Sequence, residues 1–160
     1  MIRFVFSVAL LIASVPPAIA ADAFPQSVTF GNQAFSLLEK GTMKAHALVG
    51  SVTIFDFAKY AAPDQQQLLV LRAARKLSAK QLQQVFRGIV AGSSGFSDAQ
   101  LEAFLNLLPS ADSGTMLRLR SDPNGLQLLA GDTLAGSVEA SPLATAIWAG
   151  FSGEKVAAHK

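Results

Sequence analysis

The sequence of 160 residues contains no cysteine, one tryptophan, one tyrosine and two histidines. The lack of cysteine excludes disulfides and thiolate metal sites, so a folded domain must be stabilised by its apolar core. The two histidines, His46 and His159, do not have the spacing of metal ligands, and no acidic cluster accompanies them. The sequence therefore predicts neither a metal site nor a cofactor.

Charged residues are scarce, at 15% of the chain, and their signs almost balance, with 13 basic and 11 acidic residues. A nucleic-acid surface requires clustered basic residues interleaved with aromatic ones, and the sequence has no such cluster. The serines do not form a G-x-S-x-G nucleophile motif. The glycine-rich segments are turn signals, because none lies between a strand and a helix as a phosphate loop does. These absences argue against nucleic-acid binding and hydrolase chemistry.

The first 20 residues have the pattern of a secretory signal peptide. Arg3 provides a short positive region, residues 4–15 form an apolar segment, and two prolines end that segment. Ala18 and Ala20 are the small residues that signal peptidase requires, which predicts cleavage after Ala20. The apolar segment is shorter than the roughly 20 residues that span a bilayer. We expect a periplasmic or secreted protein that meets the membrane only during export.

The first half of the mature chain shows the alternation and the β-branched residues typical of strands. Residues 24–38 predict two strands joined by a tight turn, and a short connection at 39–42 leads to an extended region at 44–60. Gly50 within that region predicts a bulge or a bend. A further strand, rich in leucine and valine, is expected at 66–75.

Two helices are expected next. Ser78 and Gln81 form a capping box, and apolar residues recur at helical spacing as far as Val90. Ser97 caps a second helix, which Pro109 should stop. Each helix has one apolar stripe, so both are expected to cover one face of a sheet.

Residues 113–151 predict two or three strands and a final helix. The segment 122–125, Asp-Pro-Asn-Gly, is a strong turn signal between two alternating segments. Ser141 offers an N-cap oxygen with Pro142 at the first helical position, and Gly150 lies where the helix should end. The order ββββ(β)–αα–βββ–α predicts an α+β fold, an antiparallel sheet covered on one face by helices.

Three segments together resemble the bacterial chalcone isomerase-like family. They are VTIFDFAKYA (52–61), LVLRAARKLSAKQL (69–82) and the C-terminal segment that ends in Ile147-Trp148-Ala149-Gly150. The resemblance covers nearly the whole mature chain and implies an open-faced sandwich, in which helices cover a curved antiparallel sheet. Together with the signal-peptide pattern, it divides the chain into a signal peptide at 1–20, a chalcone isomerase-like domain at 21–153 and a tail at 154–160.

The family contains chalcone isomerases, fatty-acid-binding members and non-catalytic relatives. The resemblance implies an arginine that binds a phenolate in the isomerases and, with a tyrosine, a carboxylate in the fatty-acid-binding members. Tyr60 matches that tyrosine, but the arginine is missing, because the matching positions fall on Ala47 or near Met43. Phe55 also replaces a residue that is usually tyrosine or threonine, and Lys59 replaces a leucine. The resemblance therefore implies a binding protein with no catalytic residues.

Arginines on the expected strands are further candidates for anion binding. Arg118 and Arg120 share strand parity and should point to one side, expected to be the solvated face. Pairing with an acidic residue such as Asp56 is the alternative role for any of them.

The leading hypothesis is an exported, non-enzymatic protein that holds a small apolar ligand, such as a fatty or aromatic acid, between sheet and helices. Tyr60 with Lys44 or His46 would form the polar end, since Lys44 and His46 share strand parity. Two alternatives stay open, a diverged lyase or isomerase that acts on an enone and a filled-core scaffold that binds a partner. The oligomeric state is also open. The apolar wall is expected to include Phe55, Phe57, Val85, Phe86, Ile89, Phe104 and Trp148.

Overall fold

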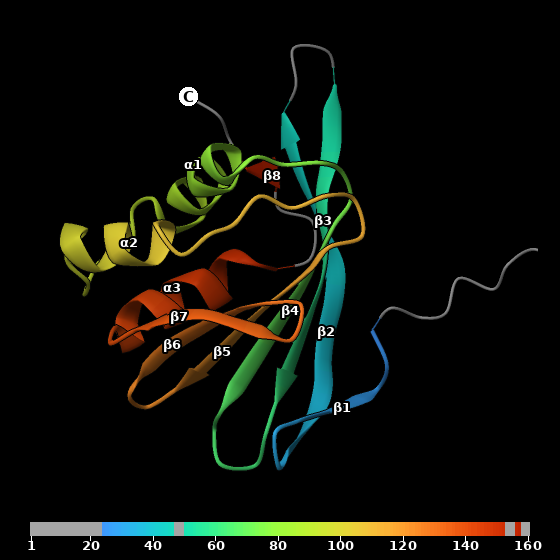
Figure 1. Ribbon diagram of the computed structural model, residues 1–160, viewed down its shortest axis with the longest axis vertical. Coiled ribbons are helices and arrows are strands. Elements are labelled where there is room, and N and C mark those ends of the chain that lie inside the picture. The colour runs from blue at the N-terminus through green and yellow to red at the C-terminus, as the bar shows by residue number, and fades with distance from the viewer. Residues whose placement is uncertain (1–23, 47–49, 153–155, 158–160) are drawn as a thin grey trace, which may run out of the picture.

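The computed structural model of the chain describes residues 24–46, 50–152 and 156–157. These residues form one eight-stranded sheet and three helices (Figure 1). The predicted signal peptide lies outside them. Among the described helices, none has the length and apolar content needed to cross a membrane. The strands are β1 (Ser27–Phe30), β2 (Gln33–His46), β3 (Ser51–Ala61), β4 (Gln67–Ala73), β5 (Met116–Asp122), β6 (Gly125–Ala130), β7 (Thr133–Val138) and β8 (Val156–Ala157), and the helices are α1 (Ala79–Val90), α2 (Asp98–Leu105) and α3 (Ser141–Gly150).

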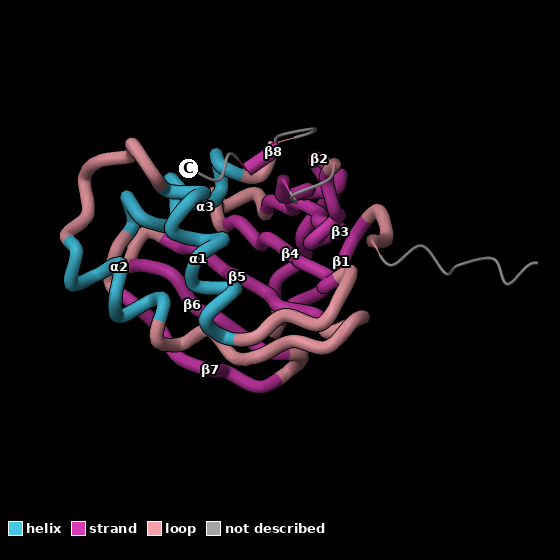
Figure 2. The backbone as a smooth tube through the Cα atoms, turned by 90° about the horizontal axis from the view of Figure 1, so that it is seen from above, coloured by secondary structure: helices cyan, strands magenta, loops and turns pink. Residues whose placement is uncertain are grey.

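Strands β1 to β7 lie in the sheet in chain order, each antiparallel to the next. The sheet curls around the three helices, which lie together on one of its faces (Figure 2). This arrangement confirms the predicted α+β class. Strand β8 pairs in parallel with β2 at Lys44 and Ala45, so the sheet extends into the segment predicted as a tail.

Strand β2 shows where the sequence prediction was wrong. The predicted connection at 39–42 is part of this strand and pairs with β3 throughout, for example Gly41 with Phe57. A register shift between Leu37 and Glu39 accommodates an extra residue without ending the strand. The chain reverses after β2, and Gly50, with φ of +80°, lies just before β3 instead of inside a strand.

Helices α1 and α2 begin at the predicted caps, whereas α3 begins one residue earlier than predicted. Both capping boxes are formed, so the Ser78 and Ser97 hydroxyls accept backbone N–H bonds. Helix α2 ends at Leu105, before the proline that was expected to stop it. The N-cap of α3 is Ala140, and Ser141 is the first helical residue. Its hydroxyl instead donates to the carbonyl of Pro123, at 3.1 Å.

The two faces of the sheet are covered differently. Side chains alternate along each strand, so Phe57 and Leu69 point to the inner face, toward the helices, where the main core lies. Ala58, Tyr60 and Leu68 point to the outer face and form a separate, smaller core. Further buried members of the outer core are Phe24, Phe35, Ala62 and Val70.

Candidate functional site

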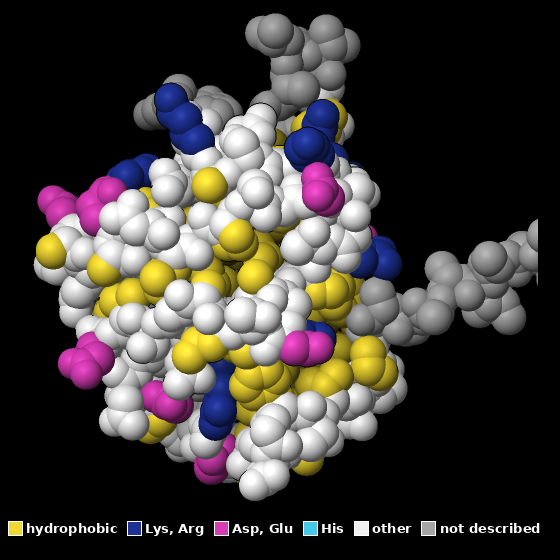
Figure 3. Space-filling model, in the orientation of Figure 1, with side chains coloured by type: hydrophobic (Ala, Val, Ile, Leu, Met, Phe, Trp, Pro, Cys, Tyr) yellow, Lys and Arg dark blue, Asp and Glu magenta, His cyan; other side chains and the backbone are white. Residues whose placement is uncertain are grey.

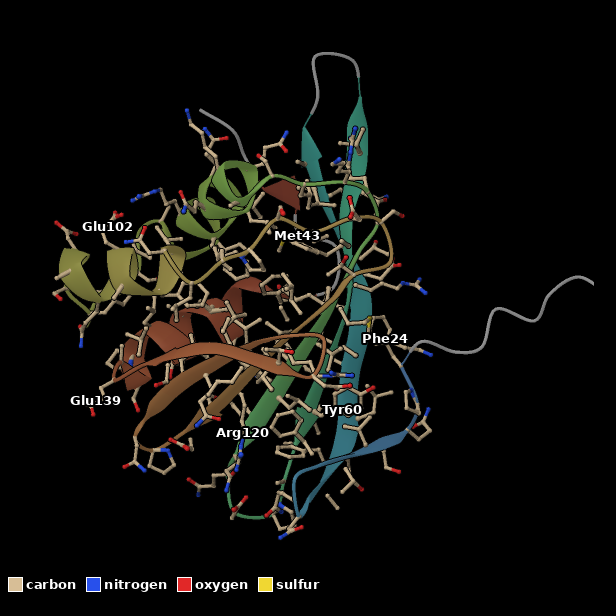
Figure 4. The ribbon with its side chains drawn as sticks, in the orientation of Figure 1. Phe24, Met43, Tyr60, Glu102, Arg120 and Glu139 are labelled. Carbon is tan, nitrogen blue, oxygen red and sulfur yellow. The ribbon has the colours of Figure 1, made fainter. Side chains whose placement is uncertain are left out.

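Residues 24–30, called the strap from here on, cross the outer face of the sheet and cover the smaller core (Figure 4). The Tyr60 hydroxyl donates a hydrogen bond to the carbonyl of Pro25 at 3.0 Å. The Leu37 N–H donates to the carbonyl of Gln26 at 2.8 Å, and β1 pairs with β2. Tyr60, with 1% of its surface exposed, thus joins the strap to the end of β3.

Two arginines add further contacts to the strap. The guanidinium of Arg72 lies 5.9 Å from the ring centroid of Phe24, and that of Arg120 lies 5.7 Å from the ring centroid of Phe30. Both arginines are held by a second partner, Asp56 for Arg72 and Gln66 for Arg120. Cation–π contacts of this kind stabilise the strap against the outer face.

A pocket of about 390 Å³ lies between the strap and the outer face. This volume is in the range of about 300–1,000 Å³ that is typical of small-molecule sites. In the space-filling view, apolar side chains gather in the lower part of the visible face, beside basic and acidic ones (Figure 3). The pocket is lined by the apolar residues Pro25, Val28, Phe30, Leu68, Val70 and Met116 and by the polar residues Thr29, Tyr60, Arg118 and Asp132.

Arg118 is the cation of this pocket. It lies opposite Val70 in the sheet, and 26% of its side chain is exposed. Its Nη1 donates to the carbonyl of Gly131 at 2.5 Å and to Oδ1 of Asp132 at 2.7 Å. Within the described residues, Nε and Nη2 donate to no protein group. The planar fork of a guanidinium can therefore bind a ligand carboxylate through these two nitrogens.

The structure does not bring the predicted polar end together. Tyr60 pairs with Leu37, whereas Lys44 pairs with Thr53. Positions 53 and 60 on β3 are about 23 Å apart at the usual rise per strand residue. The backbone of His46 pairs with Ser51, and its side chain lies outside the described part of the structure. Lys44 and His46 thus lie at the other end of β2 from Tyr60.

The predicted apolar wall is present, but on the opposite face from Tyr60, and its aromatic rings pack against one another. Phe55 is fully buried, and its ring centroid lies 6.4 Å from that of Phe151, a residue that the prediction missed. Phe57 lies 5.6 Å from the same ring, and Phe86 lies 6.0 Å from it. Phe86 also contacts Phe104 in an edge-to-face pair at 5.3 Å. The aromatic residues that the sequence assigned to a ligand wall are here part of the main core.

Lys59 is a second residue that the sequence did not single out as functional. It is the only charged residue among the buried described residues, with 6% exposed. Its Nζ lies 3.2 Å from Oε2 of Glu39 and 5.3 Å from the ring centroid of Trp148. A buried ammonium requires such partners, since an unpaired charge in the core is costly. Lys59, which stands where the resemblance expects a leucine, therefore forms an ion pair that joins β3 to β2, and Trp148 of α3 covers it.

Only some features of the pocket could be predicted from the sequence. The shared parity of Arg118 and Arg120 correctly predicted that both point to one face. Nothing in the local pattern indicated that the strap covers this face, because the strap and Met116 are far apart in the chain. No sequence pattern indicated a functional role for Asp132, which lies in a turn.

A scan of known protein families finds no model that matches this chain, and no curated protein is similar to it in sequence. Among solved structures, the chain is similar to AtFAP1, a fatty-acid binding protein of Arabidopsis thaliana, with a TM-score of 0.68. The two share 18% sequence identity, over 83% of this chain and 85% of the other. The similarity shows the fold, so the chain has the chalcone isomerase-like α+β fold that its sequence predicted.

Proposed function

We propose that the protein is an exported, non-enzymatic member of the chalcone isomerase-like family that binds a small monocarboxylic acid with an apolar tail. The ligand lies in the pocket under the strap, on the outer face of the sheet. Its carboxylate pairs with Arg118, and its tail contacts the apolar lining. The observation that carries this proposal is a guanidinium with two donor nitrogens that bind no group of the described residues, beside a partly apolar pocket of about 390 Å³.

Physical chemistry favours an acid over a neutral apolar molecule in this pocket. Burial of apolar surface contributes about 25 cal/mol per Å² for either ligand. The acid gains in addition a charge-assisted, bidentate contact with Arg118, and such contacts are worth about 1.5–3 kcal/mol. The fold shared with a protein described as a fatty-acid binding protein is consistent with this ligand class.

Tyr60 keeps a place in the proposed site, but its role changes. The sequence suggested that its hydroxyl binds the ligand directly. In the structure the hydroxyl donates to the carbonyl of Pro25, so we assign Tyr60 to holding the strap over the pocket. Its ring forms part of the pocket lining.

The binding test compares decanoate with decanol by isothermal titration calorimetry. Arg118→Met removes the charge and keeps an apolar stem, so decanoate should bind about 10- to 100-fold more weakly, while decanol should bind as to the wild type. Arg75→Met is the matched control, because Arg75 is exposed and lies outside the pocket. Wild-type protein that binds neither compound, or Arg118→Met protein that binds decanoate normally, would contradict the proposal.

Export is proposed from the N-terminal pattern alone. Cleavage after Ala20 would leave a mature chain that starts at Ala21, three residues before the strap. The intact mass of protein recovered from the periplasm or the medium should match residues 21–160. A full-length mass, or protein that stays in the cytoplasm, would refute export while leaving the binding proposal untouched.

A further inference from the structure

We infer that Asp132 is an internal competitor for the ligand carboxylate at Arg118, so that it sets how tightly the pocket binds acids relative to neutral molecules. This inference rests on the proposed function, because it concerns the same pocket. It adds a residue that determines specificity and that no sequence pattern indicated.

The geometry places Asp132 where a ligand acid would compete with it. Asp132 lies in the turn between β6 and β7, and both it and Arg118 line the pocket. Its Oδ1 accepts a hydrogen bond from Nη1 of Arg118 at 2.7 Å. The carbonyl of Gly131, in the same turn, accepts a second bond from the same nitrogen. The turn thus holds one edge of the guanidinium, and the other edge is left for a ligand.

The ion pair between Arg118 and Asp132 is weak enough for a ligand to displace Asp132. The side chain of Asp132 is 97% exposed, whereas that of Arg118 is 26% exposed. An ion pair with one partner in water is weak, because the carboxylate loses little when it returns to solvent. The Gly131 carbonyl would keep Arg118 in place if Asp132 moved away. Asp132 is therefore the partner that can leave while the arginine stays at the pocket.

Asp132 opposes an acid in two ways. Its carboxylate occupies part of the guanidinium, and its negative charge repels a second carboxylate held a few ångströms away. A neutral ligand with the same tail experiences neither effect. Asp132 should therefore weaken the binding of acids only, which keeps a bound acid exchangeable.

The experiment titrates decanoate and decanol into the wild type, Asp132→Asn and Asp112→Asn. Asp132→Asn keeps the shape of the side chain and removes its charge, so decanoate should bind about two- to fivefold more tightly, with decanol unchanged. This gain should shrink as salt is raised, because the repulsion is screened. Asp112→Asn removes the same charge from an 81% exposed position outside the pocket and should change neither affinity.

The outcomes separate the two proposals. If the wild type and Asp132→Asn bind decanoate measurably and equally, or if the variant binds it more weakly, the inference is wrong and the proposed function stands. If neither protein binds decanoate, the proposed function fails and the inference fails with it. Circular dichroism of Asp132→Asn should match the wild type, since the replaced side chain lies in water.

Discussion

Replacing Phe151 with alanine is expected to lower the free energy of unfolding by about 3–5 kcal/mol. Phe151 follows α3 directly and is fully buried. Its ring packs against Phe55 and Phe57 of the sheet and against Phe86 of α1, with ring centroids 5.6–6.4 Å apart. Truncation leaves a cavity between three separate elements, which cannot close without moving the helices relative to the sheet.

Urea denaturation, followed by circular dichroism and by the fluorescence of the single tryptophan, measures this loss. Leu134→Ala is a suitable control, because that side chain is 57% exposed and its truncation should cost no more than about 0.5 kcal/mol. A loss of less than about 1 kcal/mol for Phe151→Ala would show that the inner core is loosely packed. That result would again make the space between sheet and helices a candidate ligand site.

Replacing Gly125 with alanine is expected to cost about 3 kcal/mol, from a clash together with an unfavourable backbone conformation. A Cβ atom at this position would lie 2.3 Å from the carbonyl oxygen of Val138 and 3.1 Å from the Cα of Glu139. The obstacle is the backbone of β7 and its following residue, which cannot rotate away as a side chain can. Gly125 also has φ of +157°, which side chains rarely adopt.

Gly131 provides the matched control in the next turn of the same sheet. It also has a positive φ, of +60°, but a Cβ there would meet nothing within 4 Å. Gly131→Ala should therefore cost only the conformational strain, about 1 kcal/mol. Thermal unfolding of both variants separates the two effects, and equal losses would contradict the proposed clash with Val138.

The turn that contains Gly125 was predictable, because local hydrogen bonds close it. Oδ1 of Asp122 accepts hydrogen bonds from the N–H groups of Asn124 and Gly125, at 2.8 and 3.1 Å. These bonds join residues two and three positions apart, so the residue types alone specify the turn. The capping boxes at Ser78 and Ser97 were predictable for the same reason, since each is closed by a residue three positions later.

Errors arose where long-range pairing outweighs local preference. Gly41 and Thr42 predict a break when taken alone, yet both lie within β2, because β3 offers partners on both sides of the bulge. Helix α2 ends at Leu105, although the local pattern allowed it to continue toward Pro109. Sheet pairing and helix packing decide such boundaries, and neither can be evaluated from a short window.

The sequence by itself determined the α+β class, the order of strands and helices as far as α3, and which side chains share a face, because these depend on periodicity and on contacts between near neighbours. The tertiary structure alone decided that aromatic rings pack together on the inner face and that the strap bounds a pocket on the outer face. Phe151 contributes to the filling of the inner face, while the strap brings Phe30 over Tyr60, Arg118 and Asp132 on the outer face. Burial and pocket formation depend on residues that are distant in the chain, so alternation could place Arg118 on a face but could not show what covers it.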